Sequence, residues 1–258
     1  MTFQTLPDRF AVIADVHGNS DALRAVLQDI QSLGIGRTLN LGDHFSGPLD
    51  AGGTAQILGH PDVRANMLSL RGNHDRYLIE QAVADMGPSD RAAHAALPPS
   101  ALDWIRNLPV TLTLGKVFAC HATPHDDQTY WTHEATAAGG VTLRSRARIE
   151  AFADGIDAGL ILCAHTHLPI IMGLSGGRVL VNPGSVGCPA YTDTHPVPHV
   201  VETGSPRACY AVIQQCDTGL RVVHRHVPYD TARIAGLARG LGRKDWAQAV
   251  ETGWISPL

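Results

Sequence analysis

Short apolar runs that end in polar, glycine-containing segments recur along this chain. The first run, at 10–14, is followed by Asp15 and His17. A short apolar run that leads into a polar loop is typical of a buried strand at its exit from a sheet. Apolar residues then recur at helical spacing from 20 to 33, and Gly34 ends the pattern. The pattern predicts a strand, a loop and an amphipathic helix in succession.

The same alternation continues through most of the sequence. Further strands are predicted at 37–41, 66–70, 116–120, 160–164, 178–181, 209–215 and 220–227. Helices are predicted near 101–107 and over 230–246. Repeated alternation of strands and helices is typical of a layered α/β fold, in which ligands gather beyond the carboxyl ends of the strands. We therefore expect an α/β fold with its site at one sheet edge.

Two long segments interrupt this alternation. Residues 122–158 combine a polar, aromatic-containing loop at 124–132 with a predicted helix at 143–153, and we interpret them as a lid insertion over a site. Residues 188–207 contain four prolines, which disfavour regular structure, so a surface loop is expected there. Because α/β domains of this size commonly form around one core, residues 1–258 are expected to form a single domain.

The composition is that of an ordinary folded protein, with 44% hydrophobic and 17% charged residues. The formal net charge is −4 and the chain has no long basic run, which disfavours binding to extended nucleic acid. The sequence contains no signal peptide pattern and no apolar run long enough to span a membrane. Five cysteines without metal-type CxxC spacing favour free thiols in a reducing compartment. We expect a cytoplasmic protein without a membrane partner.

Histidine is frequent, with 14 copies, and several lie at the ends of predicted strands beside carboxylate or amide residues. The strand-end motifs are Asp15-x-His17, Gly42-Asp43, Gly72-Asn73-His74-Asp75, His121 and His165-Thr166-His167. Each motif alone also fits a turn or a surface histidine. Five strand ends that offer metal ligands to one edge of a sheet together favour a metal site.

These motifs, in this order, resemble the calcineurin-like metallophosphoesterase superfamily, whose pattern is D-x-H, G-D, G-N-H-[DE], a lone H and G-H-x-H. The resemblance implies a two-sheet α/β sandwich flanked by helices. It also implies two sets of metal ligands, which are Asp15, His17 and His167 for one ion, Asn73, His121 and His165 for the other, and Asp43 as a bridge. His74 corresponds to the catalytic histidine.

The chain departs from the family pattern at Ala164, where glycine is usual, and no ligand is lost there. The segment 42–47 lacks the G-D-x-x-D-R-G pattern of protein Ser/Thr phosphatases, which disfavours that branch. The segment 182–187, Asn-Pro-Gly-Ser-Val-Gly, instead resembles the compact prokaryotic phosphodiesterase branch.

The implied cofactors are two divalent or mixed-valence transition metal ions, and mixed nitrogen and oxygen ligands suit Mn, Fe or Zn. Two such ions can hold a phosphoryl oxygen and activate a bridging hydroxide for attack on phosphorus. The expected function is hydrolysis of phosphoesters, as a phosphodiesterase or phosphatase acting on small phosphorylated molecules such as nucleotides. The alternatives are a metal-stabilised scaffold without turnover, which the presence of His74 disfavours, and a nuclease, which the missing basic run disfavours.

Residues next to the motifs have proposed roles. We expect His74 to protonate the leaving oxygen or to stabilise charge on the phosphoryl group. Asp75 is expected to orient the His74 imidazole, with a helix cap as its alternative role. Arg76 is a candidate for binding substrate phosphate, and surface solvation is its alternative.

Several other residues near the motifs are left without a site role. The histidines interpreted as solvated loop residues are His44, His125 and His133. Tyr130 and Trp131 could stack on a nucleobase or anchor the lid. Cys120 and Cys163 are expected to be small buried apolar residues.

Overall fold

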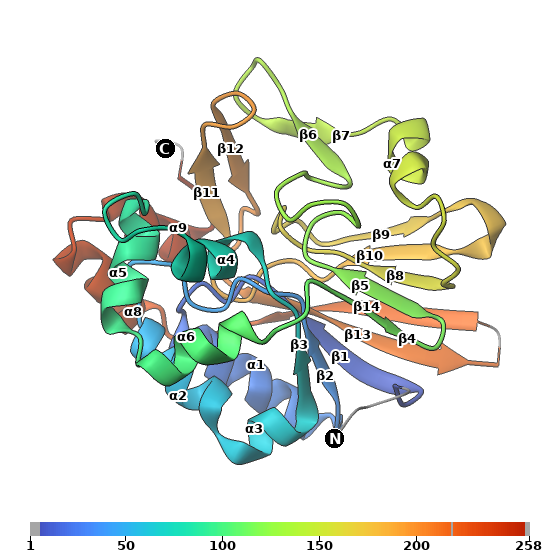
Figure 1. The fold of residues 1–258 in the computed structure, drawn as a ribbon, viewed down its shortest axis with the longest axis horizontal. Coiled ribbons are helices and arrows are strands. Elements are labelled where there is room, and N and C mark those ends of the chain that lie inside the picture. The colour runs from blue at the N-terminus through green and yellow to red at the C-terminus, as the bar shows by residue number, and fades with distance from the viewer. Residues whose placement is uncertain (1–5, 218, 256–258) are drawn as a thin grey trace.

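We describe residues 6–217 and 219–255 of the chain in a computed structural model. Two five-stranded sheets pack against each other (Figure 1). The first sheet has the order β14-β13-β1-β2-β3, with bounds Gly219–Val227, Ala208–Cys216, Arg9–Ile13, Thr38–Asn40 and Met67–Ser69. The second has the order β4-β5-β8-β10-β9, with bounds Thr111–Leu114, Val117–Cys120, Leu160–Leu162, Val179–Asn182 and Ile170–Gly173.

Each sheet contains three adjacent parallel strands, which lie at one side of the first sheet and in the centre of the second. Strands β1, β2 and β3 run parallel, as do β5, β8 and β10. Antiparallel pairing adds β13 and β14 to the first sheet and β4 and β9 to the second. The prediction of a layered two-sheet α/β fold is therefore confirmed.

The two sheets bury one apolar layer between them. Alternate residues of β1, Phe10 and Val12, lie in this layer with Leu160 and Leu162 of β8. Because successive strand residues face opposite sides, Ala11 and Ile13 of β1 face the helices instead. Both faces of β1 are therefore buried, which explains the uninterrupted apolar run in its sequence.

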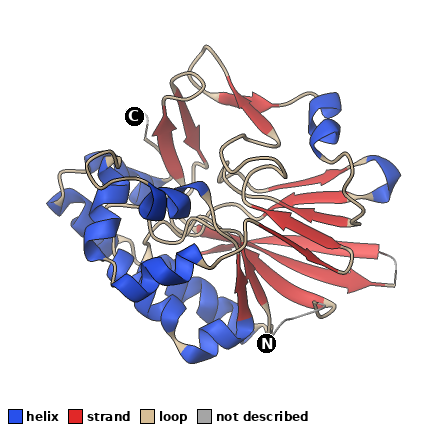
Figure 2. Ribbon diagram, viewed as in Figure 1, coloured by secondary structure: helices blue, strands red, loops and turns tan. Residues whose placement is uncertain are grey.

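Helices cover the outer face of the first sheet and gather on one side of the molecule (Figure 2). They are α1 Ser20–Ser32, α2 Ala51–Gly59, α3 Pro61–Asn66, α4 Asn73–Glu80, α5 Pro88–Ala96 and α6 Pro99–Arg106. Helix α1 begins where the Asn19 side chain accepts a hydrogen bond from the backbone N–H of Ala22, and it buries Leu23, Val26 and Ile30. The start and the apolar face of α1 follow the sequence prediction.

The segment 122–158 contains more regular structure than predicted. A hairpin of β6 (His133–Ala135) and β7 (Val141–Leu143) precedes α7 (Arg146–Phe152). The helix predicted at 143–153 therefore begins at Arg146, three residues after its predicted start. Strand β7 has only three residues and is largely exposed, so the alternation that marks a half-buried strand is absent from its sequence.

Two other predictions need correction. The segment 188–207 is not an irregular loop, because β11 (Ala190–Asp193) pairs with β12 (His199–Glu202), and all four prolines lie outside the two strands. The predicted single helix at 230–246 is two helices, α8 (Ala232–Gly240) and α9 (Lys244–Thr252). Gly242 lies between them with φ of 75°, a backbone conformation that ends a helix. Within the described residues, no helix combines the length and the apolar character required to cross a membrane.

Candidate metal centre

The loops that follow the parallel strands of both sheets meet at one edge of the sandwich. Asp15 N–H donates to the Gly42 carbonyl, and His17 N–H donates to the Asp43 carbonyl, so the loops after β1 and β2 run side by side. The loops after β5 and β8 are joined in the same way, by a bond from Ala164 N–H to the His121 carbonyl. Parallel strands deliver their carboxyl ends to a common edge, and this brings the strand-end motifs together.

One group of side chains consists of Asp15, His17 and His167, whose potential ligand atoms lie within 4.8 Å of one another. The Nε2 atoms of His17 and His167 are 3.2 Å apart, and Nε2 of His167 lies 3.5 Å from Oδ1 of Asp15. We call this set the first group. Its three side chains come from the loops after β1 and β8 and are buried.

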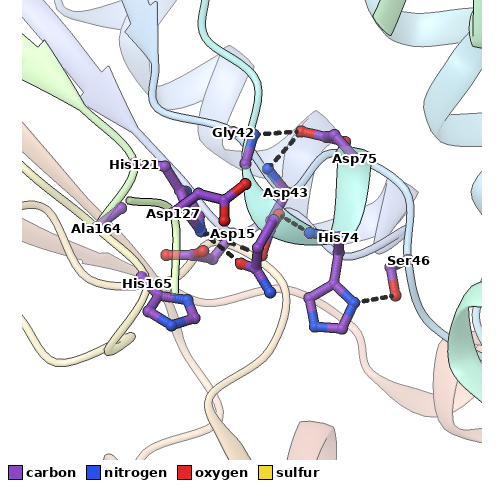
Figure 3. A network of polar contacts seen from close by, with 12 residues as sticks. Asp15, Gly42, Asp43, Ser46, His74, Asp75, His121, Asp127, Ala164 and His165 are labelled. Atoms are coloured by element: carbon purple, nitrogen blue, oxygen red, sulfur yellow. Dashed lines mark hydrogen bonds and ion pairs between the residues drawn. The ribbon is translucent and has the colours of Figure 1, made fainter. Parts of the chain in front are cut away.

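The second group consists of Asp43, His121 and His165, and its potential ligand atoms also lie within 4.8 Å of one another. Nε2 of His121 lies 3.3 Å from Oδ2 of Asp43 and 3.0 Å from Oδ1 of Asn73. Oδ2 of Asp43 is also 3.8 Å from Nε2 of His17, a member of the first group. Asp43 therefore lies between the two groups, among the side chains drawn in Figure 3.

Each of the four group histidines donates one ring N–H to a backbone carbonyl. The pairs are His17 Nδ1 with Ser46 O, His121 Nδ1 with Leu41 O, His167 Nδ1 with Cys188 O and His165 Nε2 with Gln128 O, at 2.8, 2.8, 2.6 and 2.8 Å. A carbonyl oxygen only accepts, so the ring nitrogen must be the donor. In a neutral ring the other nitrogen then presents its lone pair, as a metal ligand does.

The charge state of these rings follows from burial and from nearby carboxylates. Burial lowers the pKa of His17 to about 4 and that of His165 to about 4, so both rings are neutral at pH 7. For His121, burial lowers the pKa, but the negative charge of Asp43 outweighs it and raises the pKa to about 10. A buried carboxylate between the groups thus attracts positive charge.

The Asp15 carboxylate has no hydrogen-bond partner for either oxygen, although it is fully buried. Burial raises the pKa of Asp15. An unpaired buried carboxylate costs several kcal/mol unless a cation or hydrogen-bond donor compensates it. Two unpartnered carboxylate oxygens that face imidazole lone pairs fit the requirements of a transition metal ion.

The backbone at both groups is unusual in the same way. Among the described residues, the non-glycine residues with positive φ are Asp15, His17, Asp43, His165 and His167, with φ between 49° and 66°. Left-handed backbone is costly for residues with a Cβ, and it is found where surrounding structure enforces it at functional sites. All five are members of the two groups.

Gly72 makes room for the Asp43 carboxylate. A Cβ atom at this position would lie 2.2 Å from Oδ1 of Asp43. That same oxygen accepts a 2.9 Å hydrogen bond from the backbone N–H of His74, at the beginning of α4. The glycine and the helix start together hold Asp43 in place, which explains why the motif begins with glycine.

His74 is held by residues that the sequence did not single out. Its Nδ1 lies 2.8 Å from Oδ1 of Asp90, on α5, and 3.2 Å from the Ser46 hydroxyl. Burial lowers the pKa of His74, but the Asp90 hydrogen bond and the charge of Asp43 outweigh it and raise the pKa to about 9. Asp90 belongs to no recognisable motif, so no signal in the sequence pairs it with His74.

The expectation that Asp75 orients His74 is wrong. The Asp75 carboxylate accepts hydrogen bonds from the backbone N–H groups of Gly72, Asp43 and His44. It also lies 2.8 Å from Nδ1 of His44. Asp75 therefore serves as a cap of α4 and fastens the loop that carries Asp43. His44 is fully buried, so its interpretation as a solvated loop residue is also wrong.

Arg76 forms a two-point ion pair with Asp127, at 2.7 and 2.8 Å, and the structure thus gives it a carboxylate partner. Trp131 donates its indole N–H to the Ile149 carbonyl and packs against Phe152, so it anchors the 122–158 segment. Tyr130 contacts the His165 ring.

The two cysteines next to the motifs are buried, as predicted. Cys120 and Cys163 are each 1% exposed. Burial raises the pKa of both thiols, so they are protonated at neutral pH. Neither belongs to the two groups described above.

An open cavity of about 940 Å³ has members of both groups at its base. Its lining includes His17, Asp43, His74, His165 and His167. The walls come from the segments 128–148, 188–196 and 243–246. This volume is at the upper end of the range for small-molecule sites, so the base is accessible to a ligand larger than a phosphate ion.

Comparisons with known proteins agree with this geometry. The model of the calcineurin-like phosphoesterase superfamily domain matches residues 9–204. An uncharacterized protein of Methanocaldococcus jannaschii is 25% identical over 248 residues, which cover 85% of this chain and 87% of the relative.

Solved structures share the fold. A metallophosphoesterase from Sphaerobacter thermophilus has a TM-score of 0.73 and 23% identity, over 95% of this chain and 99% of its own. A hypothetical protein from Pyrococcus horikoshii OT3 has a TM-score of 0.73 and 18% identity, over 96% and 99%. The matched region contains every strand-end motif, and the chain therefore belongs to the calcineurin-like phosphoesterase superfamily and is a metallophosphoesterase.

Proposed function

We propose that this chain hydrolyses small phosphoesters, diesters or monoesters of the nucleotide type, with two transition metal ions. The first group, Asp15, His17 and His167, would hold one ion. Asn73 would join His121 and His165 at the other, and Asp43 would bridge both. The observation that supports this most strongly is the buried Asp15 carboxylate, whose oxygens have no other partner.

The ligand atoms indicate the class of metal. The two groups combine imidazole nitrogen with carboxylate and amide oxygen, a mixture that suits Mn, Fe or Zn better than Ca. When bound, the two ions would polarise the phosphoryl group and make a water acidic enough to attack at neutral pH. The chain itself contributes the rigid strand ends that orient these ligands.

His74 would act on the leaving group. Its Nδ1 is occupied by Asp90 and Ser46, so the remaining ring nitrogen, Nε2, is the atom available for proton transfer. His74 also lines the cavity beside Asp43. A protonated Nε2 would donate its proton to the leaving oxygen, and Asp90 would stabilise the imidazolium before the transfer.

The chain would form a single domain. Within it, the segment 122–158 would act as a lid over the substrate. Its residues Gln128, Tyr130, Glu134, Arg144 and Arg148 line the cavity. Glu134 accepts hydrogen bonds from both arginines, at 3.2 and 2.9 Å, so this wall carries two cations and one carboxylate. A net positive wall suits the additional negative charge of a phosphorylated substrate.

The test combines metal analysis with turnover. Purified chain should bind two equivalents of Mn²⁺ and hydrolyse members of a panel of nitrophenyl monoesters, nitrophenyl diesters and nucleotides. His74→Ala should keep the metal and lose turnover. Metal binding with no hydrolysis across the panel would favour a scaffold, and tight, salt-dependent binding of long DNA would favour a nuclease.

A further inference from the structure

Helix α4 is joined to the loop at 122–132 by two side chains one turn after its first residue. Arg76 donates from Nε and Nη2 to the two oxygens of Asp127, at 2.7 and 2.8 Å. The neighbouring Tyr77 hydroxyl accepts a hydrogen bond from the Gln128 side chain. We call the Arg76–Asp127 pair the α4 latch. Two parallel N–H···O bonds fix both position and direction, unlike a single ion pair.

The loop that the latch holds is itself closed by hydrogen bonds. Oδ1 of Asp126 accepts hydrogen bonds from the backbone N–H groups of Gln128 and Thr129, at 2.9 and 2.6 Å. The Thr123 hydroxyl also donates to Asp126. Asp127 lies inside this hydrogen-bonded turn. The position of its side chain and the position of the Gln128 backbone are therefore coupled.

The Gln128 carbonyl is the acceptor for the His165 ring. His165 Nε2 lies 2.8 Å from this oxygen. That bond leaves Nδ1 of His165 to face the second group. The other group histidines rely on carbonyls outside this loop, at Ser46, Leu41 and Cys188. Of the four, His165 alone depends on the loop that the latch holds.

The helix that carries Arg76 begins next to the second group. Helix α4 starts with Asn73, whose Oδ1 lies 3.0 Å from Nε2 of His121. Arg76 follows one helical turn later. The path from Asn73 through Arg76, Asp127 and Gln128 to His165 therefore starts and ends at ligand positions of the same proposed ion.

We propose that Arg76 and Asp127 are positioning residues that set the affinity of the second group for its metal ion and leave the first group unaffected. This inference rests on the proposed two-metal function. It replaces direct phosphate binding as the role of Arg76, because Nε and Nη2 of Arg76 donate to Asp127 and its Nη1 lies 3.9 Å from Oε2 of Glu80.

Latch variants should affect metal affinity more than stability, and this difference separates a positioning role from a role in folding. The side chains of Arg76 and Asp127 are 28% and 23% exposed, and part-exposed ion pairs contribute little to stability. Loss of a partner that orients a metal-binding histidine typically weakens metal affinity by about 10–100-fold. A latch variant should therefore remain folded and lose metal affinity.

The experiment is calorimetric titration of chelator-stripped chain with Mn²⁺, with metal content measured after dialysis. Wild-type chain should bind two equivalents. Arg76→Gln and Asp127→Asn should each weaken one binding event by about 10–100-fold and leave the other unchanged. Arg76→Lys, which keeps the charge but loses the two-point geometry, should give an intermediate value.

The matched control is Arg225→Gln. Arg225 donates from Nε and Nη2 to the two oxygens of Asp29, at 2.6 and 2.8 Å, which is the same geometry between β14 and α1. This variant should keep both affinities. Thermal unfolding of every variant checks the fold, and Asp127→Asn tests the latch independently if Arg76→Gln does not fold.

The outcomes distinguish the two proposals. Wild-type chain that binds fewer than two equivalents overturns the two-metal function and the latch together. Two equivalents in wild-type chain with unchanged affinities in both latch variants overturn the latch alone. Equal weakening of both events in the latch variants, or the same weakening in Arg225→Gln, also overturns the latch.

Discussion

At the scale of single residues, the features that lower the stability of the folded chain are concentrated at a few positions. Asp15 is buried without a partner, and it shares left-handed backbone with His17, Asp43, His165 and His167. These features destabilise the metal-free chain, and a bound cation would compensate them. The residues that we propose as metal ligands are therefore the residues at which folding is least favourable.

Replacing Asp15 with Asn should separate these effects. In chelator, Asp15→Asn replaces a buried carboxyl, whose pKa burial raises above the unfolded value, with a neutral amide. This should raise the free energy of unfolding at pH 7 by about 1 kcal/mol or more, because the amide has no ionised form to desolvate. With Mn²⁺ present the order should reverse, because the variant has lost a ligand. Urea unfolding in EDTA and in Mn²⁺ measures both; a variant less stable than wild type in EDTA would contradict the desolvation argument.

The Asp90 carboxylate should matter through His74. His74→Ala should lower kcat by about 10²–10⁴-fold, the usual range for a general acid. Asp90→Asn should lower kcat by a smaller factor, about 10-fold or more, with KM little changed. Adding Asp90→Asn to His74→Ala should cause no further loss, since the two residues act as a unit. Steady-state kinetics on one nitrophenyl ester measures this, and additive losses would show that Asp90 acts elsewhere.

At the scale of elements, helices and strands are joined by polar contacts that the apolar pattern does not reveal. Helix α1 is fastened to the first sheet by Asp29, which accepts hydrogen bonds from Tyr210 on β13 and from Arg225 on β14. Hydrogen bonds with Arg225 hold the pKa of Asp29 below its usual value. The hydrogen bonds that join α1 to the first sheet are therefore strongest when Asp29 is ionised.

Asp29→Asn should lower stability in a pH-dependent way. At pH 7 the loss should be about 1–2 kcal/mol, between the values for charged hydrogen bonds and for surface ion pairs. Because the folded pKa is the lower one, this stabilisation is complete above the unfolded pKa of about 4 and disappears as pH falls through the folded pKa. Urea unfolding of both chains from pH 7 to pH 3 should show the difference narrowing; a constant difference would assign the effect to packing.

At the scale of the whole molecule, the proposed metal centre links the two sheets. Asp15, His17 and Asp43 follow strands of the first sheet, whereas His121, His165 and His167 follow strands of the second. The apolar layer between the sheets also holds them together, as does the hydrogen bond from the His224 ring on β14 to the Asn182 carbonyl on β10. Bound metal should therefore stabilise the assembly of the two halves.

Removal of metal should lower the melting temperature of the chain. Ligand at about 100 times its Kd stabilises the folded state by about 2.7 kcal/mol, which corresponds to roughly 5–10 °C for a chain of this size. EDTA followed by dialysis should produce this shift, and added Mn²⁺ should reverse it. Asp43→Ala should melt at the same temperature with and without Mn²⁺; a metal-dependent shift in that variant would argue against Asp43 as the bridge.

The sequence by itself determined the α/β alternation, the superfamily and the side chains that stand at the strand ends. These features are encoded locally, because a buried strand needs an apolar run and its exit loop carries the polar motif. The hairpin β6–β7, the pair β11–β12 and the break between α8 and α9 were not predicted. Their strands are short and their prolines or glycines lie just outside them, so the local pattern resembles a loop.

Only the tertiary structure decided which partners orient the strand-end residues. Asp75, next to His74 in sequence, caps α4, whereas Asp90, 16 residues away, reaches the His74 ring from another helix. Arg76 points to Asp127, 51 residues away, and not into the cavity base. A side chain's direction depends on the packing of the element that carries it, and that packing involves residues far apart in the chain. The identity of the proposed metal ligands can therefore be read from the local sequence. The orientation of the strand-end side chains cannot, because it depends on distant residues.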